Sequence, residues 1–336
     1  MNTPPVDARL IDRAVAILRQ GGLVAMPTET VYGVAADAEN ADAVRAVFAA
    51  KGRPADHPVI VHVADATALD RWARAVPEGA RALAAAFWPG PLTIVLPRSA
   101  RASDLITGGQ DTVGLRCPSH PWAHALLAAF GGAVVAPSAN SFGRISPTTA
   151  AHVLADLGVK PSGRIDLILD GGPCPVGIES TIVDVSGAAP RLLRPGLIKR
   201  EQLQQVLGRP VEAADEDAPR APGRLEKHYS PRTPLALVAP AALRSRIAEF
   251  AARRLAVLAP AHYLEPPDPH VVLALPAADE PDEYARSLYA NLHRMDASGA
   301  DQLLIAEPPR GPDWLAVHDR LSRAQAGTAR SSNSPI

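Results

Sequence analysis

Short apolar runs and amphipathic segments alternate along the chain through residue 207. Compact aliphatic runs bounded by turn residues predict buried strands, whereas apolar residues three and four positions apart predict helices. The expected strands cover residues 23–26, 59–63, 92–96, 112–116, 133–136, 166–169, 181–185 and 191–194. The expected helices lie near residues 10–20, 40–51, 80–87, 120–130 and 197–207. This mixture indicates an α/β domain.

Capping signals locate several helix ends. Asn40 is a good N-cap, and Lys51-Gly52 is typical of a helix C-terminus. Ser146-Pro147 combines a capping hydroxyl with proline at the first helical position, which predicts a helix starting there.

The pattern changes between residues 208 and 234. This stretch is rich in Pro, Ala, Asp and Glu and lacks apolar periodicity, which predicts a linker, and it contains the aromatic and basic island Lys227-His228-Tyr229. Beyond it, strand-like runs at 235–239, 255–258, 271–275 and 303–306 alternate with helical patterns at 241–254, 282–295 and 314–326. This alternation predicts a smaller parallel-sheet domain over 235–326, followed by a disordered tail over 327–336.

Composition excludes several classes of protein. The 34 Lys and Arg against 35 Asp and Glu give a net charge of -1, which lacks the positive field of a dedicated nucleic-acid binder. No apolar run reaches the roughly 18 residues of a membrane-spanning helix, and the first residues do not resemble a secretory signal. Cys117 and Cys174 are isolated, which argues against a disulfide scaffold or cysteine zinc module and favours a cytoplasmic location.

Standard nucleotide and protease motifs are missing from the sequence. There is no G-x-x-x-x-G-K-[ST] loop, no G-x-G-x-x-G after the first strand and no H-E-x-x-H. No Ser-His-Asp order or nucleophilic cysteine signature supports covalent catalysis. Instead, polar residues gather where predicted strands end, which is where ligands bind in α/β sheets.

Two polar clusters occur in the first quarter of the chain. Thr28-Glu29-Thr30 directly follows a predicted strand and forms either a ligand site or a hydrogen-bonded turn. In Lys51-Gly52-Arg53-Pro54, the Gly and Pro fix a bend that presents both cations together, as a polyphosphate clamp needs. The alternative is that Lys51 only complements the helix dipole.

The remaining candidates lie at later strand ends. His62 interrupts an apolar strand and is either a core residue or a ligand contact. Arg116 is suited either to bidentate hydrogen bonding with a carboxylate or to a surface ion pair. The hydroxyls between Ser138 and Thr148 precede a predicted helix N-terminus, which is a candidate anion site as well as an N-cap. Arg194 and Glu179-Ser180-Thr181 do not indicate a ligand site when each is taken alone. The polar clusters taken together predict a strongly anionic ligand.

The order of these motifs resembles that of the YrdC-type threonylcarbamoyl-AMP synthases, in the long form with a His-Tyr-Ser-Pro linker and a C-terminal α/β domain. The matching segments are Pro27-Thr28-Glu29-Thr30-Val31-Tyr32-Gly33, Lys51-Gly52-Arg53-Pro54, Ser138-Ala139-Asn140, Ser146-Pro147-Thr148, Glu179-Ser180-Thr181-Ile182-Val183-Asp184, Arg194-Pro195-Gly196 and His228-Tyr229-Ser230-Pro231. The resemblance covers nearly the whole chain. It implies a twisted mixed-sheet catalytic domain with an open concave site over 1–207, a linker over 208–234 and a Rossmann-like parallel α/β domain over 235–326.

The resemblance also implies the reaction. L-Threonine, bicarbonate or carbon dioxide, and ATP would give threonylcarbamoyl-AMP and pyrophosphate, which is a nucleotidyltransferase activity. Mg²⁺ would accompany ATP without ligands from side chains. The product would pass to a separate tRNA threonylcarbamoyl transferase complex for threonylcarbamoyladenosine formation, and neither membrane nor stable nucleic-acid binding is expected.

Site residues carry over position by position from the resemblance. It implies that the catalytic residues are Lys51 and Arg53, and that threonine is held by Thr30, His62, Arg116, the backbone of Ala136, and Ser180. It implies ATP contacts from Lys51, Arg53, His57, Thr112, Ser138, Ser146 and Arg194, with His228 and Tyr229 lying over the nucleotide when the linker closes. The chain departs from the family in having His57 where Asn is common, Phe142 in place of Ser, and Arg224-Leu225-Glu226 in place of Met-Lys-Tyr.

Two other functions fit the sequence less well. A carbamoyl-adenylate-forming enzyme of the hydrogenase-maturation kind uses a related domain, but it also carries cysteine-rich zinc segments for which two cysteines leave no room. A non-catalytic RNA-binding module is disfavoured by the net charge of -1 and by the lack of Arg/aromatic runs.

Overall fold

The computed structural model describes residues 3–223, 228–250 and 252–328. The chain divides into two compact units, the first comprising Met1–Phe142 and Ser146–Arg224, the second Gly143–Ile145 and Leu225–Ile336. The short segment Gly143–Ile145 joins the second unit because the Ser230 N–H donates to the Gly143 carbonyl (2.8 Å).

A mixed sheet forms the centre of the first unit, so the expected mixed α/β fold is confirmed. Over the described residues it has ten strands in the order β10-β9-β8-β4-β5-β3-β6-β2-β1-β7. Their bounds are β1 Val24–Met26, β2 Gly33–Asp37, β3 Val61–His62, β4 Leu92–Pro97, β5 Thr112–Arg116, β6 Val134–Val135, β7 Leu167–Ile168, β8 Thr181–Asp184, β9 Arg191–Arg194 and β10 Glu212–Ala213. Four neighbouring pairs are parallel (β1–β7, β3–β5, β4–β8 and β9–β10), and the others are antiparallel.

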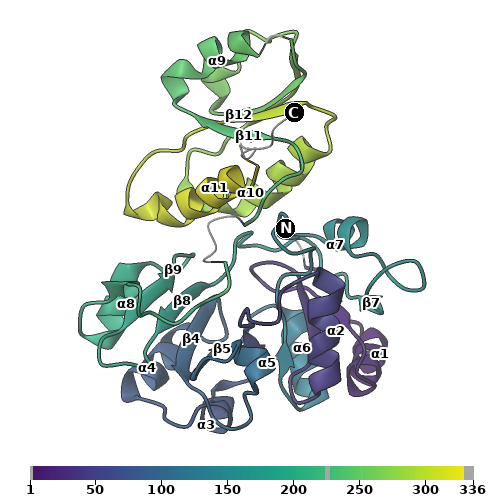
Figure 1. Cartoon of the computed structure of the whole chain (residues 1–336), viewed down its shortest axis with the longest axis vertical. Coiled ribbons are helices and arrows are strands. Elements are labelled where there is room, and N and C mark those ends of the chain that lie inside the picture. Colours follow the sequence, from purple (N-terminus) through teal and green to yellow (C-terminus); the bar gives the residue numbers. More distant parts are fainter. Residues whose placement is uncertain (1–2, 224–227, 251, 329–336) are drawn as a thin grey trace, which may run out of the picture. The chain divides into compact units, whose positions relative to one another are not determined.

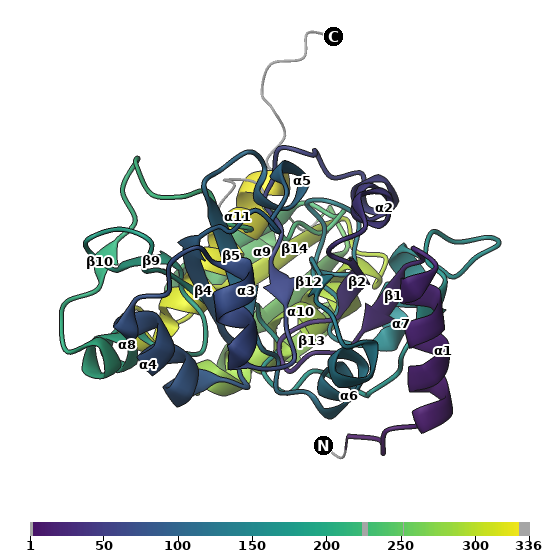
Figure 2. The ribbon, with the colours of Figure 1, turned by 90° about the horizontal axis from the view of Figure 1, so that it is seen from below.

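Helices cover the two faces of this sheet unequally. They are α1 Ala8–Arg19, α2 Ala41–Lys51, α3 Leu69–Trp72, α4 Glu78–Phe87, α5 Asp104–Thr107, α6 Pro121–Phe130, α7 Ala150–Asp156 and α8 Arg200–Leu207, with a 3₁₀ turn η1 at Ala66–Ala68. One core packs α2, α4 and α8 against alternate strand residues that include Val61, Ile94 and Leu115. On the opposite face, α1 and α6 cover Val24 and Val134. Figure 2 shows α1 and α6 near β1, and α4 and α8 near β4 and β9.

Capping expectations were met at one helix and wrong at another. Asn40 accepts the N–H groups of Asp42 (3.0 Å) and Ala43 (3.1 Å), and Gly52 ends α2 at a φ of 63°. The helix expected at Ser146-Pro147 instead begins at Ala150 with Thr149 as N-cap. Ser146 and Pro147 form tertiary contacts instead. The Ser146 hydroxyl donates to Glu179 (2.5 Å), and the Pro147 carbonyl accepts the Tyr32 N–H (2.9 Å).

The second unit contains a four-stranded parallel sheet, which confirms the second expected sheet. Its order is β11-β14-β12-β13, with β11 Leu235–Val238, β12 Leu255–Ala259, β13 Val271–Pro276 and β14 Gln302–Ala306. Figure 1 shows α9 (Leu243–Glu249) on one face and α10 (Pro281–Asp296) and α11 (Leu315–Thr328) on the other. Short 3₁₀ turns occupy Pro240–Ala242, Ala261–Tyr263 and Pro312–Trp314. Since α11 reaches Thr328, the part of the expected tail beyond it lies outside the described residues.

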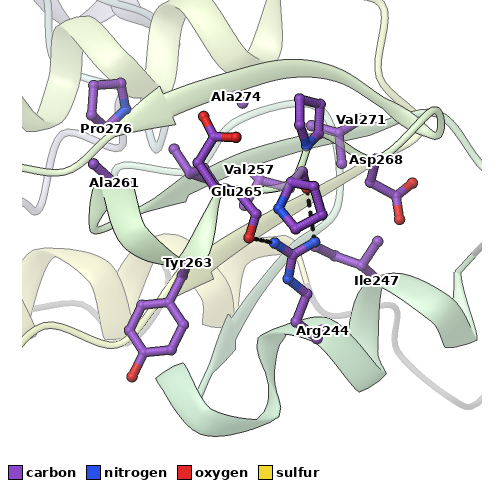
Figure 3. Close-up of a pocket in the computed structure, with 13 residues that line it drawn as sticks. Arg244, Ile247, Val257, Ala261, Tyr263, Glu265, Asp268, Val271, Ala274 and Pro276 are labelled. Carbon is purple, nitrogen blue, oxygen red and sulfur yellow. Dashed lines mark hydrogen bonds between the residues drawn. The ribbon is translucent and has the colours of Figure 1, made fainter.

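A cavity of about 340 Å³ lies beside β12 and β13, where the connection between these strands carries only a 3₁₀ turn. Arg244 of α9 fixes this connection by donating to the carbonyls of Glu265 and Pro266 (Figure 3). Val257, Val271 and Ala274 contribute an apolar lining. The residues singled out by the motifs do not line this cavity. Among the described residues, no helix has the length and apolar character needed to cross a membrane.

Candidate active site

Strand register brings the polar residues of distant segments onto one face of the large sheet. His62 of β3 pairs with Arg116 of β5, and Thr93 of β4 pairs with Ile182 of β8. Because side chains alternate along a strand, these residues point away from the core formed with α2, α4 and α8. We call this the site face.

Arg116 forms a buried ion pair with Glu29. Its Nη2 donates to Glu29 Oε1 at 2.7 Å, and the two side chains are only 5% and 6% exposed. The other carboxylate oxygen accepts the Ser119 N–H at 3.1 Å. Among the protein groups that the structure describes, Arg116 Nε–H has no acceptor although it is buried. The guanidinium is therefore fixed at one end and has a spare donor.

His62 lies beside Arg116 as a neutral imidazole. Burial, with a smaller contribution from the Arg116 charge, lowers the pKa of His62 to about 3. Its Nδ1 lies 3.3 Å from the Ile60 carbonyl, which can only accept, so the ring proton belongs on Nδ1. Nε2 is then a hydrogen-bond acceptor at neutral pH.

The hydroxyl protons of Thr28 and Thr30 can be assigned from their partners. Thr28 Oγ1 donates to the Val31 carbonyl at 2.6 Å and accepts the N–H groups of Thr30 and Val31. Since its single proton is used there, the 2.9 Å contact between the two hydroxyls requires Thr30 to donate. The lone pairs of Thr30 then remain available as acceptors.

A second group of polar residues surrounds Ser180. Arg194 donates from Nε to the Ser180 carbonyl and from Nη2 to its hydroxyl, both at 3.0 Å. Thr93 lies 2.8 Å from the same hydroxyl. Glu179, the residue before Ser180, accepts the Ser146 hydroxyl, so two motifs that are distant in sequence are joined here.

Lys51 ends α2 inside the protein rather than at its surface. Its Nζ donates to the carbonyls of Ser138 and Asn140 (2.5 Å to Asn140), joining the Lys51-Gly52-Arg53-Pro54 segment to the segment between Ser138 and Thr148. Burial, and then the nearby Arg53 charge, hold the pKa of Lys51 well below its usual value. Ser138 also bridges to Gly33, next to the Thr28–Thr30 segment.

Arg53, His57 and Phe142 form a neighbouring group. The Arg53 guanidinium lies 5.7 Å from the Phe142 ring centre, and the His57 ring lies 5.4 Å from it. Arg53 Nη2 also donates to the Pro58 carbonyl at 2.7 Å. Burial and Arg53 lower the pKa of His57. The two positions that depart from the family pattern, His57 and Phe142, are therefore in contact with each other.

The first half of the expected linker is part of the first unit. Arg194 Nη1 donates to the Pro222 carbonyl at 3.0 Å, and Arg220 exchanges hydrogen bonds with Gln110. Small linker side chains cover an apolar patch of the site face, with Ala214, Ala218 and Ala221 packing against Ile60, Val95, Ile182 and Leu193. Thr112, at the start of β5, alternates with Gly114 and Arg116 and so shares this face.

His228 and Tyr229 belong to the second unit. The Tyr229 ring is 5.6 Å from the Tyr289 ring and 5.5 Å from the Arg320 guanidinium, and it is buried. Tyr229 has a φ of 62°, an uncommon conformation for a residue other than glycine. Lys227 and the segment Arg224-Leu225-Glu226 lie outside the described residues.

Three residues of the site were not among those assigned from the motifs. Glu29 binds Arg116, Thr93 contacts Ser180, and Phe142 packs against Arg53. Thr93 could have been noticed as a polar residue inside the apolar run 92–96. The remaining assigned residue, Ala136, follows β6, and its N–H donates to the Ile60 carbonyl at 3.2 Å.

Neither cysteine has the properties of a nucleophile. Burial raises the pKa of the Cys117 thiol to about 11 and raises the pKa of Cys174 as well. Both thiols therefore stay protonated near neutral pH, and the thiolate is the reactive form. The chemistry of the site is the binding of charge by fixed cations, together with neutral acceptors beside them.

Two family models match the chain. The Sua5/YciO/YrdC model, described as "Telomere recombination", matches residues 16–196. A second model, described as "Threonylcarbamoyl-AMP synthase, C-terminal domain", matches residues 198–326.

Relatives and solved structures agree with these matches. The chain is 39% identical over 324 residues to a threonylcarbamoyl-AMP synthase of Pyrococcus abyssi, spanning 93% of this chain and 92% of the relative. It is 39% identical over 327 residues to the Bacillus subtilis protein of the same name, spanning 94% and 93%. The structure of P. abyssi Sua5 complexed with L-threonine superimposes with a TM-score of 0.87 at 36% identity, covering 97% of this chain and 96% of that one.

Proposed function

This chain belongs to the threonylcarbamoyl-AMP synthase family, and from that premise we propose how its side chains divide the work of the reaction. The enzyme is of the nucleotidyltransferase type. It makes threonylcarbamoyl-AMP from L-threonine, bicarbonate or carbon dioxide, and ATP, releasing pyrophosphate, for the threonylcarbamoyladenosine modification of tRNA.

Threonine binding is assigned to the part of the site face around Arg116. The spare Nε–H donor of Arg116 suits the substrate carboxylate, and the acceptors at His62 Nε2 and Thr30 Oγ1 suit the amino group. Ser180 and the backbone of Ala136 complete the proposed subsite. This set of one cationic donor and two neutral acceptors is the hydrogen-bonding complement of an α-amino acid.

ATP is assigned to the basic residues around Lys51. Lys51 and Arg53 are proposed to act on the phosphates and Arg194 to bind the nucleotide, with further contacts from His57, Thr112, Ser138 and Ser146. The support is the hydrogen bonding that joins Lys51 to Ser138 and Arg194 to Ser180. His228 and Tyr229 are proposed to cover the nucleotide when the linker closes, excluding water.

Mg²⁺ is proposed to arrive with ATP. Among the described residues, no group of three or more His, Cys, Asp or Glu side chains is arranged to hold an ion. Phosphate oxygens and water are the ligands that Mg²⁺ most often uses in such sites. When bound, the ion would neutralise charge on the phosphates, and no side chain is assigned to it.

The chemical step follows from this arrangement. The amino nitrogen of threonine loses one proton to water and bonds to the carbon of carbon dioxide as a C=O π bond opens, and a second proton leaves the nitrogen to water to give the carbamate. A carbamate oxygen then attacks the α-phosphorus while the bond to pyrophosphate breaks. Because the pKa of His62 is about 3, this side chain orients the amino group and does not remove its proton. Positioning of the reactants, which supplies about 7–11 kcal/mol in well-oriented cases, is proposed to be the main contribution.

The observation that carries this proposal is the buried Arg116 guanidinium, whose Nε–H has no acceptor among the described protein groups and which pairs across β3 and β5 with the neutral His62. The test is to incubate the protein with ATP, Mg²⁺, bicarbonate and threonine, omitting each in turn, and to detect the adenylate by mass spectrometry. The adenylate should require every component. Pyrophosphate release that does not depend on threonine would contradict the proposed division of residues.

Arg194→Ala is expected to weaken ATP binding about tenfold or more, because a charged hydrogen bond contributes roughly 1.5–3 kcal/mol. Calorimetric titration with ATP measures this directly. The matched control is Arg209→Ala, since Arg209 is exposed and donates only to the Ala188 carbonyl in the described contacts. Unchanged ATP affinity of Arg194→Ala would remove Arg194 from the ATP site.

The product is proposed to pass to a separate tRNA threonylcarbamoyl transferase complex. A mixed anhydride of a carbamate and AMP is hydrolysed by water, so the enzyme that consumes it must act soon after release. The net charge of -1 supports transfer of the small molecule without stable tRNA binding by this chain.

A further inference from the structure

We propose that Glu29 is a positioning residue for threonine, which acts by fixing the Arg116 guanidinium; this inference rests on the proposed threonine site. Glu29 is 87 residues from Arg116 in sequence, and both side chains are buried. A carboxylate inside a site for anionic ligands is unexpected, because it repels the substrate carboxylate. The carboxylate of Glu29 must therefore make favourable interactions that exceed this repulsion.

The hydrogen bonds that Glu29 accepts are these favourable interactions. One oxygen accepts from Arg116 Nη2 at 2.7 Å, and the other accepts from the Ser119 N–H at 3.1 Å. Since Ser119 is part of the main chain that follows β5, Glu29 connects the Arg116 guanidinium to the backbone just beyond this strand. The carboxylate thereby holds the plane of the guanidinium.

Fixing the guanidinium determines where its Nε–H donor points. Arg116 Nε–H has no protein acceptor among the described residues, whereas Nη2 is occupied by Glu29. His62, paired with Arg116 across β3 and β5, lies on the same side of the sheet. The geometry assigns the spare donor to the threonine carboxylate, next to the acceptor that receives the amino group.

The charge of Glu29 has a second effect. A buried guanidinium without a counter-charge is costly, and the Glu29 carboxylate supplies this counter-charge to Arg116. When threonine binds, its carboxylate adds a second acceptor to a cation that is already oriented. Threonine then does not have to immobilise a flexible arginine, which lowers the entropic cost of binding.

Glu29→Gln tests this role, because glutamine keeps the length of the side chain. Its amide can satisfy only one of the two donors, Arg116 Nη2 or the Ser119 N–H, since its other group is itself a donor. The KM for threonine is expected to rise roughly 30-fold, the lower end for disrupting a buried charge pair, while the KM for ATP stays unchanged. A matched control is Glu39→Gln, which alters an exposed pair with Arg101.

A purely structural role would give a different result. L-Threoninol, which lacks the carboxylate, should inhibit the wild type and Glu29→Gln equally if Glu29 acts through the carboxylate contact. A loss of thermal stability with a lower kcat and both KM values unchanged would overturn the proposal, as would equal weakening of threonine and threoninol. Arg116→Lys in the same assays distinguishes failure of the proposed threonine site from failure of the positioning role of Glu29. If it leaves the threonine KM unchanged, the proposed threonine site is wrong; if only Glu29→Gln has no effect, the positioning role alone fails.

Discussion

Arg116→Ala is expected to abolish threonine-dependent synthesis and to lower the free energy of unfolding by about 3–5 kcal/mol, the usual cost of removing one partner of a buried ion pair. Both consequences follow from one contact. The Arg116–Glu29 pair is about 95% buried on each side, so the deletion leaves a carboxylate without its counter-charge. The same deletion removes the donor assigned to the threonine carboxylate. Denaturant unfolding and the pyrophosphate assay measure the two losses separately.

Two further variants separate the loss of the Arg116 charge from the loss of its donor geometry and from the general effect of removing an arginine. Arg116→Lys retains the positive charge next to Glu29, so it should fold, but it lacks the planar set of donors and should still raise the threonine KM. Arg74→Ala is the surface counterpart, since Arg74 donates to both oxygens of Asp111 but is exposed. It should change neither stability nor activity appreciably. Full activity of Arg116→Ala would refute the assignment.

Much of the fold could be predicted from local patterns. The expected strands at 112–116 and 191–194 coincide with β5 and β9, and the cap at Asn40 and the stop at Gly52 are both present. These elements were predictable because their signals are local, namely apolar alternation and capping chemistry. Strand β2 was not expected, because Gly33–Asp37 contains small residues whose alternation is weak.

Long-range pairing was the part that sequence could not supply. Glu29 was recognised as polar, but its partner Arg116 is specified only by the order of strands in the sheet. The Ser146 hydroxyl fits an N-cap locally, yet it binds Glu179 from a distant segment, and the tertiary contact overrides the local preference. Ala214 and Ala218 lie against the site face although alanines in a proline-rich stretch indicate a linker.

Lys51→Ala is expected to lower kcat about 100-fold, in the range seen when one preorganised donor to a developing charge is removed. The Lys51 ammonium is held by the Ser138 and Asn140 carbonyls and is almost completely buried. A cation fixed in this way needs no reorganisation when charge moves toward pyrophosphate. Lys160→Ala, which alters a half-exposed lysine paired with Asp166, is the matched control and should retain activity.

The pH dependence distinguishes a role of the Lys51 charge from a role in packing. Burial and Arg53 lower the pKa of Lys51, so its cationic form is lost as pH rises through a value well below that of an ordinary lysine. The wild-type kcat/KM for ATP should therefore fall on the alkaline side, because this ratio reports ionisation in the free enzyme. Lys51→Ala should lack that decline, since the titrating group is gone. Lys51→Arg should also lack it, because arginine remains charged throughout the range. If both variants retain the wild-type decline, another group titrates, and Lys51 contributes through its hydrogen bonds to the Ser138 and Asn140 carbonyls alone.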